Sequence, residues 1–107
     1  MKVSIKKSTL KNKKFTAVFF ENDKKIKTTH FGQRGAPDYT ILSKTLPKNE
    51  ALLRKLAYIN RHSKEAELWK SDPMSAATLS KFINWNKETF AASLKDYLKT
   101  FKLQLNS

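Results

Sequence analysis

The chain has 107 residues, a length that fits one domain, and its 39% hydrophobic and 11% aromatic residues are enough to form a folded core. Because it contains no cysteine, disulfides, thiolate metal sites and a cysteine nucleophile are excluded. Its 22 Lys and Arg residues against nine Asp and Glu residues give a formal net charge of +13, which predicts a polyanionic partner such as nucleic acid, an anionic membrane or an acidic protein. The alternative is that the lysine-rich surface only keeps the protein soluble.

The N-terminal segment is rich in lysine. Residues 1–12 hold four lysines, and Val3 alternates with Ile5. This pattern predicts either a lysine-rich arm or an edge strand. The segment has no long apolar run, so we expect neither a signal peptide nor secretion, and no apolar run in the chain is long enough to span a bilayer.

Residues 14–31 have the pattern of a β-hairpin. The segment KFTAVFF is β-branched and aromatic, ENDK has the composition of a turn, and KIKTTHF follows as a second strand. If residues 2–6 add a strand, the pattern predicts a three-stranded antiparallel sheet; if they form an arm, it predicts two strands.

The stretch THFGQRGAPDYT contains both glycines of the chain, Gly32 and Gly35. Paired glycines that flank two polar residues are typical of a turn with positive φ, so we expect the strand to end here and residues 32–48 to be irregular. The bend either presents Gln33 and Arg34 outward, where Arg34 and nearby backbone N–H groups could receive a phosphate, or it only redirects the chain.

Helical periodicity replaces strand periodicity in the second half of the chain. Leucine and isoleucine recur at helical spacing over residues 50–64, with Asn49 as the expected N-cap. A second helix is predicted to begin at Asp72, and a third after Asn86. The predicted fold is α+β, a single basic domain over residues 1–107, in which a small antiparallel N-terminal sheet of two or three strands is followed by about three helices packed against it.

Clustered lysines on the predicted sheet and its N-terminal segment are the first candidate binding site. They could follow the phosphates of a nucleic acid, and a two-stranded ribbon fits a major groove. The alternative is a solvated sheet edge whose lysines prevent aggregation. The candidate residues are Lys6, Lys7, Lys11, Lys13, Lys14, Lys25 and Lys27.

The predicted helix over residues 50–64 carries the second candidate site. Arg54, Tyr58 and Arg61 are spaced so that they share one face, and such a stripe could clamp phosphates and stack on a base or a sugar. In the alternative interpretation, Arg61 pairs with Glu65 and Tyr58 packs on the sheet.

No motif in the chain predicts catalysis. It has no paired-carboxylate pattern, no P-loop and no nucleophile elbow, and its two histidines, His30 and His62, are not spaced as metal ligands. We therefore expect a protein that is not an enzyme and has neither cofactor nor metal, and in which both histidines pack or form hydrogen bonds.

Several motifs occur in a characteristic order along the chain. They are FTAVFF, KIKTTHFGQRGAPDYT, RKLAYINRH, ELW, SAATLSKFINWNK and SLKDYLKTF, within about residues 14–101. This order resembles a family of small basic proteins of unknown function that are encoded by large nucleocytoplasmic DNA viruses of algae and amoebae. The resemblance implies a viral origin and a place in the virion or in the viral factory of an infected cell, but no activity.

Charge, sheet lysines and arginines together predict a non-enzymatic protein that binds nucleic acid, with duplex DNA favoured, and largely without sequence specificity. The alternative prediction is a virion structural or interaction protein whose basic face binds an acidic protein partner.

Overall fold

Four strands form one mixed sheet in the computed structural model, which describes residues 1–106. The strands are β1 (Lys2–Lys7), β2 (Lys13–Glu21), β3 (Lys24–Gln33) and β4 (Gln104–Leu105), and their order across the sheet is β3-β2-β1-β4. The first three strands are antiparallel, as predicted, whereas β4 pairs in parallel with β1 at Lys2 and Val3. The prediction of two or three strands missed β4 because two residues are too few to show a strand period.

The β2–β3 hairpin turns at Asn22 and Asp23, which both have positive φ, 52° and 64°. Asn and Asp tolerate this left-handed conformation better than most residues, and two in succession suit the twist of a tight hairpin. Buried side chains of β1 and β2 lie opposite one another on the face that carries the core, namely Val3 opposite Phe19 and Ile5 opposite Ala17.

The lysine-rich segment of residues 1–12 forms β1 and the turn that follows it. β1 pairs with β2 over its whole length, and with β4 only at its first two residues. The backbone N–H of Ser8 donates to the carbonyl of Lys14 over 3.0 Å, which closes the β1–β2 turn. The segment is thus hydrogen-bonded into the sheet along its length.

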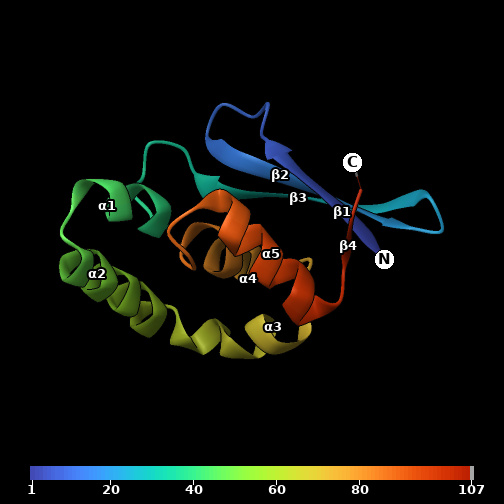
Figure 1. Cartoon of the computed structure of the whole chain (residues 1–107). Helices are drawn as coiled ribbons and strands as arrows, with labels where there is room; N and C mark the ends of the chain where they lie inside the picture. The colour runs from blue at the N-terminus through green and yellow to red at the C-terminus, as the bar shows by residue number, and fades with distance from the viewer. Residues whose placement is uncertain (107) are drawn as a thin grey trace.

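Within residues 1–106, five α-helices lie on one side of the sheet (Figure 1). They are α1 (Tyr39–Thr45), α2 (Lys48–Arg61), α3 (Ala66–Ser71), α4 (Ala76–Leu79) and α5 (Phe90–Phe101), joined by a 3-10 turn, η1 (Ser63–Glu65), and a π-helical turn, η2 (Ser80–Asn84). Figure 1 shows α4 and α5 between the sheet and the outer helices α2 and α3. The α+β class is confirmed, but the predicted number of helices was too low.

Helix α1 lies within residues 32–48, where the sequence predicts an irregular connection. The side chain of Asp38 caps this helix by accepting a hydrogen bond from the N–H of Ile41 over 3.0 Å. A helix of seven residues is too short to show a clear amphipathic period, so the prediction was wrong here. Strand β3 also continues one residue past Gly32.

The helix starts differ from the predicted N-caps. The residues at the N-cap positions of α2, α4 and α5 are Pro47, Ser75 and Thr89. The predicted caps Asn49, Asp72 and Asn86 lie instead inside α2, at the end of α3 and ahead of α5. Because residues that cap helices are also common in turns, composition alone does not select among neighbouring candidates.

The main core lies between the sheet and the segment formed by α4, η2 and α5. Its largest fully buried side chains include Phe19 and Phe31 from the sheet, Leu79 from α4, Ile83 from η2 and Tyr97 from α5.

Helix α2 is attached through a second, smaller core. Tyr39, Leu42 and Ala51 form it, and Trp85 packs against them. Because this contact buries little of α2, the leucines on its other sides stay exposed, with exposed fractions of 43% for Leu52, 65% for Leu53 and 51% for Leu56. No helix within residues 1–106 has the length and apolar character needed to cross a membrane.

Candidate functional site

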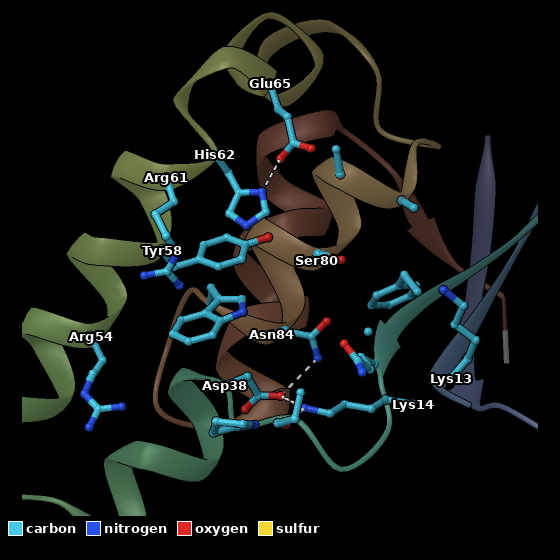
Figure 2. Close-up of a pocket in the computed structure, with 18 of the residues that line it drawn as sticks. Lys13, Lys14, Asp38, Arg54, Tyr58, Arg61, His62, Glu65, Ser80 and Asn84 are labelled. Carbon is cyan, nitrogen blue, oxygen red and sulfur yellow. Dashed lines mark hydrogen bonds and ion pairs between the residues drawn. The ribbon is translucent and has the colours of Figure 1, made fainter. Parts of the chain in front are cut away.

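A hollow of about 610 Å³ lies where α2, η2 and the end of β3 meet. We call it the first hollow. Figure 2 shows cationic, aromatic and polar side chains around it. Those with a bearing on its chemistry are Lys13, Arg54, Tyr58, Arg61, Asn84 and Trp85.

The predicted stripe on α2 faces this hollow. Arg54, Tyr58 and Arg61 all line it, so the helical spacing placed them on one face correctly. Both arginines are exposed, and neither has a carboxylate within 4 Å among residues 1–106. Glu65 pairs with His62 over 3.0 Å rather than with Arg61. The two guanidinium groups are therefore available to a ligand.

Tyr58 is held between two other rings. Its ring lies 4.5 Å from that of Trp85 at an interplanar angle of 6°, and 4.3 Å from that of His62. Burial is the main cause that raises the pKa of Tyr58 to about 12. Since both faces of the ring are occupied, Tyr58 organises the wall of the hollow instead of offering a free surface to a base, and it packs on Trp85 instead of the sheet.

A buried ion pair between Lys14 and Asp38 lines part of the first hollow. The ammonium group of Lys14 lies 2.6 Å from Oδ2 of Asp38 and also donates to the carbonyl of Ala36 over 2.6 Å. The side chains of Lys14 and Asp38 are only 14% and 6% exposed. Lys14, a predicted phosphate contact, is thus engaged within the protein, where it neutralises the carboxylate that caps α1.

A second hollow of about 420 Å³ adjoins the first, because Lys14, Asp38 and Asn84 line both. Lys7 and Arg34 also line the second hollow. The guanidinium group of Arg34 donates to the carbonyls of Ser8, over 3.0 Å, and Lys13, over 3.0 and 3.2 Å. Arg34 is exposed, which agrees with the first of the two alternatives for the bend, and it also ties the β1–β2 turn to the loop after β3.

The two glycines around Arg34 have different surroundings. Gly32 and Gly35 both have positive φ, 78° and 88°, which confirms the predicted bend. A Cβ atom on Gly32 would lie 3.1 Å from Oδ1 of Asn84 and 3.2 Å from Cβ of Lys14, whereas one on Gly35 would meet nothing within 4 Å. Gly35 therefore serves the bend alone, whereas Gly32 also allows the side chains of Asn84 and Lys14 to lie close to the backbone.

The structure separates the candidate lysines into two groups. Figure 1 shows the β1–β2 turn and the β2–β3 hairpin at opposite ends of the sheet. We call these the loop end, where the turn meets the loop of residues 34–38 and the two hollows lie, and the hairpin end. Lys7, Lys11 and Lys13 lie at the loop end with Arg34, and Lys6 precedes them on β1. Lys25 and Lys27 lie at the hairpin end, away from both hollows.

Sequence reasoning missed three residues of the first hollow. Asp38 and Asn84 are 46 positions apart, and the amide nitrogen of Asn84 donates to Oδ2 of Asp38 over 3.3 Å. Trp85 packs on the small core and also lines the hollow. No local pattern marks such residues, because their role arises from contacts between distant segments.

Both histidines form hydrogen bonds, as expected. Nδ1 of His30 lies 2.8 Å from Oγ1 of Thr16, and Nδ1 of His62 lies 3.0 Å from Oε1 of Glu65. Among the described residues, no group of three His, Asp or Glu side chains is arranged to hold a metal ion.

The fold and its hollows define a small basic α+β protein with a cationic site at one end of a mixed sheet. The chain belongs to a family of unknown function, DUF5754, whose match covers residues 3–62 and so more than half of the chain. No curated protein and no solved structure matches it. The matched segment supplies Lys13, Asp38, Arg54 and Arg61 to the first hollow, and Asn84 comes from outside it.

Proposed function

We propose that the protein binds nucleic acid without catalysing a reaction, with duplex DNA favoured and little dependence on sequence. The supporting observation is the lack of internal compensation for its charge. Of its 22 Lys and Arg side chains, only Lys14 and Lys70 lie within 4 Å of a carboxylate in the described part of the chain. A surface of this kind attracts polyanions and releases their counterions on binding.

The loop end is the proposed contact surface. The two hollows adjoin, and their linings bring Lys7, Lys13, Arg54 and Arg61 together from two strands and a helix. Cations spread over a hollowed surface suit several phosphates of one backbone, and contacts to phosphates position a protein without reading bases. The resemblance to viral proteins adds the proposal that this DNA is viral and that the protein acts in the virion or the viral factory.

A second candidate function is binding to an acidic protein. It is supported by the exposed leucines of α2, which lie on the same helix as Arg54 and Arg61. Protein interfaces combine apolar anchors with charged residues at their rim, whereas a phosphate backbone has no use for exposed leucine.

The proposal is tested by anisotropy titrations of a labelled duplex over a range of salt concentrations. Contacts with about 5–8 phosphates predict that log affinity falls linearly with log salt, with a slope of about −4 to −7. An affinity that does not change with salt would contradict the proposal, and no binding to duplex at physiological salt would favour the acidic protein partner.

Paired substitutions locate the contact surface. Arg54→Gln with Arg61→Gln removes two free guanidinium groups, so we expect duplex affinity to fall by about 10- to 100-fold and the magnitude of the salt slope to fall by about 2. The matched control, Lys25→Gln with Lys27→Gln, removes the same charge at the hairpin end and should change affinity by less than about threefold. Equal losses in both pairs would show that the whole charge acts, not the loop end.

A further inference from the structure

The side-chain oxygen of Asn84 is buried and has no hydrogen-bond partner within the described chain. Asn84 is only 3% exposed. Its amide nitrogen donates to Oδ2 of Asp38 over 3.3 Å. Because a carboxylate held by Lys14 only accepts hydrogen bonds, the nitrogen must face Asp38 and the oxygen must face away.

Asn84 and Gly32 both line the first hollow. Figure 2 shows the side-chain oxygen of Asn84 on the side that is turned away from Asp38. Gly32 lies close to this oxygen, since a Cβ on Gly32 would lie only 3.1 Å from it. A buried acceptor without a donor destabilises a protein by about 1–3 kcal/mol, so it requires an explanation. A ligand that donates an N–H or O–H group would supply one.

The charges of the hollow indicate the other end of such a ligand. Its two carboxylates already have partners inside the protein, Asp38 with Lys14 and Glu65 with His62. The guanidinium groups of Arg54 and Arg61 have none among residues 1–106. The free charge in the lining is therefore positive, and guanidinium groups match the geometry of phosphate oxygens.

The size and walls of the hollow fit an aromatic ligand. A volume of about 610 Å³ lies within the range of small-molecule sites. Phe31 and Trp85 line the hollow and give it an aromatic wall, which Tyr58 supports by stacking on Trp85. A phosphate, a flat ring and an amino donor occur together in nucleotides, whose adenine and cytosine bases carry exocyclic amino groups.

We propose that the first hollow is a nucleotide-binding pocket, in which Arg54 and Arg61 hold the phosphate and Oδ1 of Asn84 accepts a hydrogen bond from an amino group of the base. This proposal deepens the function proposed above and rests on it, since it names the unit of nucleic acid that the site would take. The same chemistry comes from a free nucleotide or from a nucleotide within a strand.

Three small probes test the two ends of the ligand separately. Isothermal titration compares adenosine 5′-monophosphate, purine riboside 5′-monophosphate, which lacks the amino group, and adenosine, which lacks the phosphate. We expect adenosine monophosphate to bind at least about 10-fold more tightly than either of the others, the ratio expected for one lost hydrogen bond to a buried group. Equal binding of the first two probes would overturn the role of Asn84.

Substitutions link each probe to a residue. Asn84→Leu should abolish the preference for the amino group, Arg54→Gln with Arg61→Gln should abolish the preference for the phosphate, and Lys25→Gln with Lys27→Gln should leave both unchanged. If Asn84→Leu does not fold, the comparison of probes on the unmodified protein still decides the question. Displacement of the mononucleotide by an oligoadenylate would support a nucleotide within a strand as the source, and its retention would support a free nucleotide.

The two proposals can fail independently. If the protein binds duplex DNA but no mononucleotide at millimolar concentration, the pocket is overturned and the proposed function stands. If it binds the mononucleotide but no DNA or RNA, the pocket stands and the proposed function is overturned.

Discussion

The loop end and the hairpin end of the sheet are both basic, but their cations have different surroundings. At the loop end, Lys14 is buried against Asp38, and Arg34 donates to two backbone carbonyls. At the hairpin end, Lys25 and Lys27 are exposed and make no ion pair among residues 1–106. The difference shows that the role of a lysine or arginine depends on what the fold packs around it, because burial strengthens an ion pair that water would screen.

The largest expected difference between the two ends concerns Lys14. Lys14→Met leaves the carboxylate of Asp38 buried without its cation, so we expect the free energy of unfolding to fall by about 3 kcal/mol. Lys25→Met at the hairpin end should change it by no more than about 0.5 kcal/mol. Urea unfolding of both variants measures the difference, and equal midpoints would show that the pair does not stabilise the loop end.

The two glycines divide the loop end further. Gly32→Ala introduces strain at positive φ and a contact with Asn84 and Lys14, so we expect a loss of about 2–3 kcal/mol. Gly35→Ala introduces the strain alone and should lose about 1 kcal/mol. Thermal unfolding of the two variants compares them. Similar losses would mean that Asn84 and Lys14 move aside at little cost when position 32 gains a Cβ atom.

A pH comparison tests the packing of Tyr58 at the loop end. Its pKa is raised to about 12 in the folded protein, mainly by burial, against an unfolded value near 10. The neutral ring therefore contributes stability that is fully present below pH 10 and is lost as the pH rises from 10 to 12. When the pH rises from 9 to 11, we expect the free energy of unfolding to fall by about 1 kcal/mol more in the unmodified protein than in Tyr58→Phe.

Groups common to both proteins cancel in this comparison. Burial lowers the pKa of Lys55 and Lys81 and raises that of Tyr97, and the substitution removes none of these side chains. Urea midpoints at the two pH values give the result. Parallel losses in the two proteins would show that Tyr58 does not titrate as a buried group.

The smallest expected effect concerns Arg34. Sequence reasoning predicts that Arg34→Ala weakens polyanion binding and leaves stability nearly unchanged, since two glycines offer it little to pack on. Its hydrogen bonds to Ser8 and Lys13 change this expectation to a loss of about 1 kcal/mol, because exposed charged hydrogen bonds stabilise modestly. Melting temperatures of Arg34→Ala and Lys27→Ala measure it, and identical values would restore the first expectation.

Short stretches of sequence predicted those features of the structure that depend on residues close together in the chain. Two segments rich in β-branched and aromatic residues around a turn-forming ENDK predicted the hairpin of β2 and β3, and the spacing of Arg54, Tyr58 and Arg61 placed them on one face of α2. Positive φ at Gly32 and Gly35 also followed from residue type. These features depend on backbone sterics and on the periods of helix and strand, which a short window of sequence contains.

Short or distant features were not predictable in this way. Helix α1 and strand β4 are too short to show a period, and β4 forms only because the end of the chain returns to β1. The sequence did not predict that Tyr58 packs on Trp85, because Trp85 comes from a segment 27 positions away.

The sequence by itself determined the α+β class, the excess of positive charge, the bend at the glycines and the stripe on α2. Only the tertiary structure decided which cations stay free, since it buries Lys14 against Asp38, 24 positions away, and leaves Arg54 and Arg61 at an open hollow. It also decided that Asn84, which lines that hollow, has a side-chain oxygen without a hydrogen-bond partner among residues 1–106. The physical reason is that burial and hydrogen bonding between distant segments depend on how the elements pack, which no local period encodes.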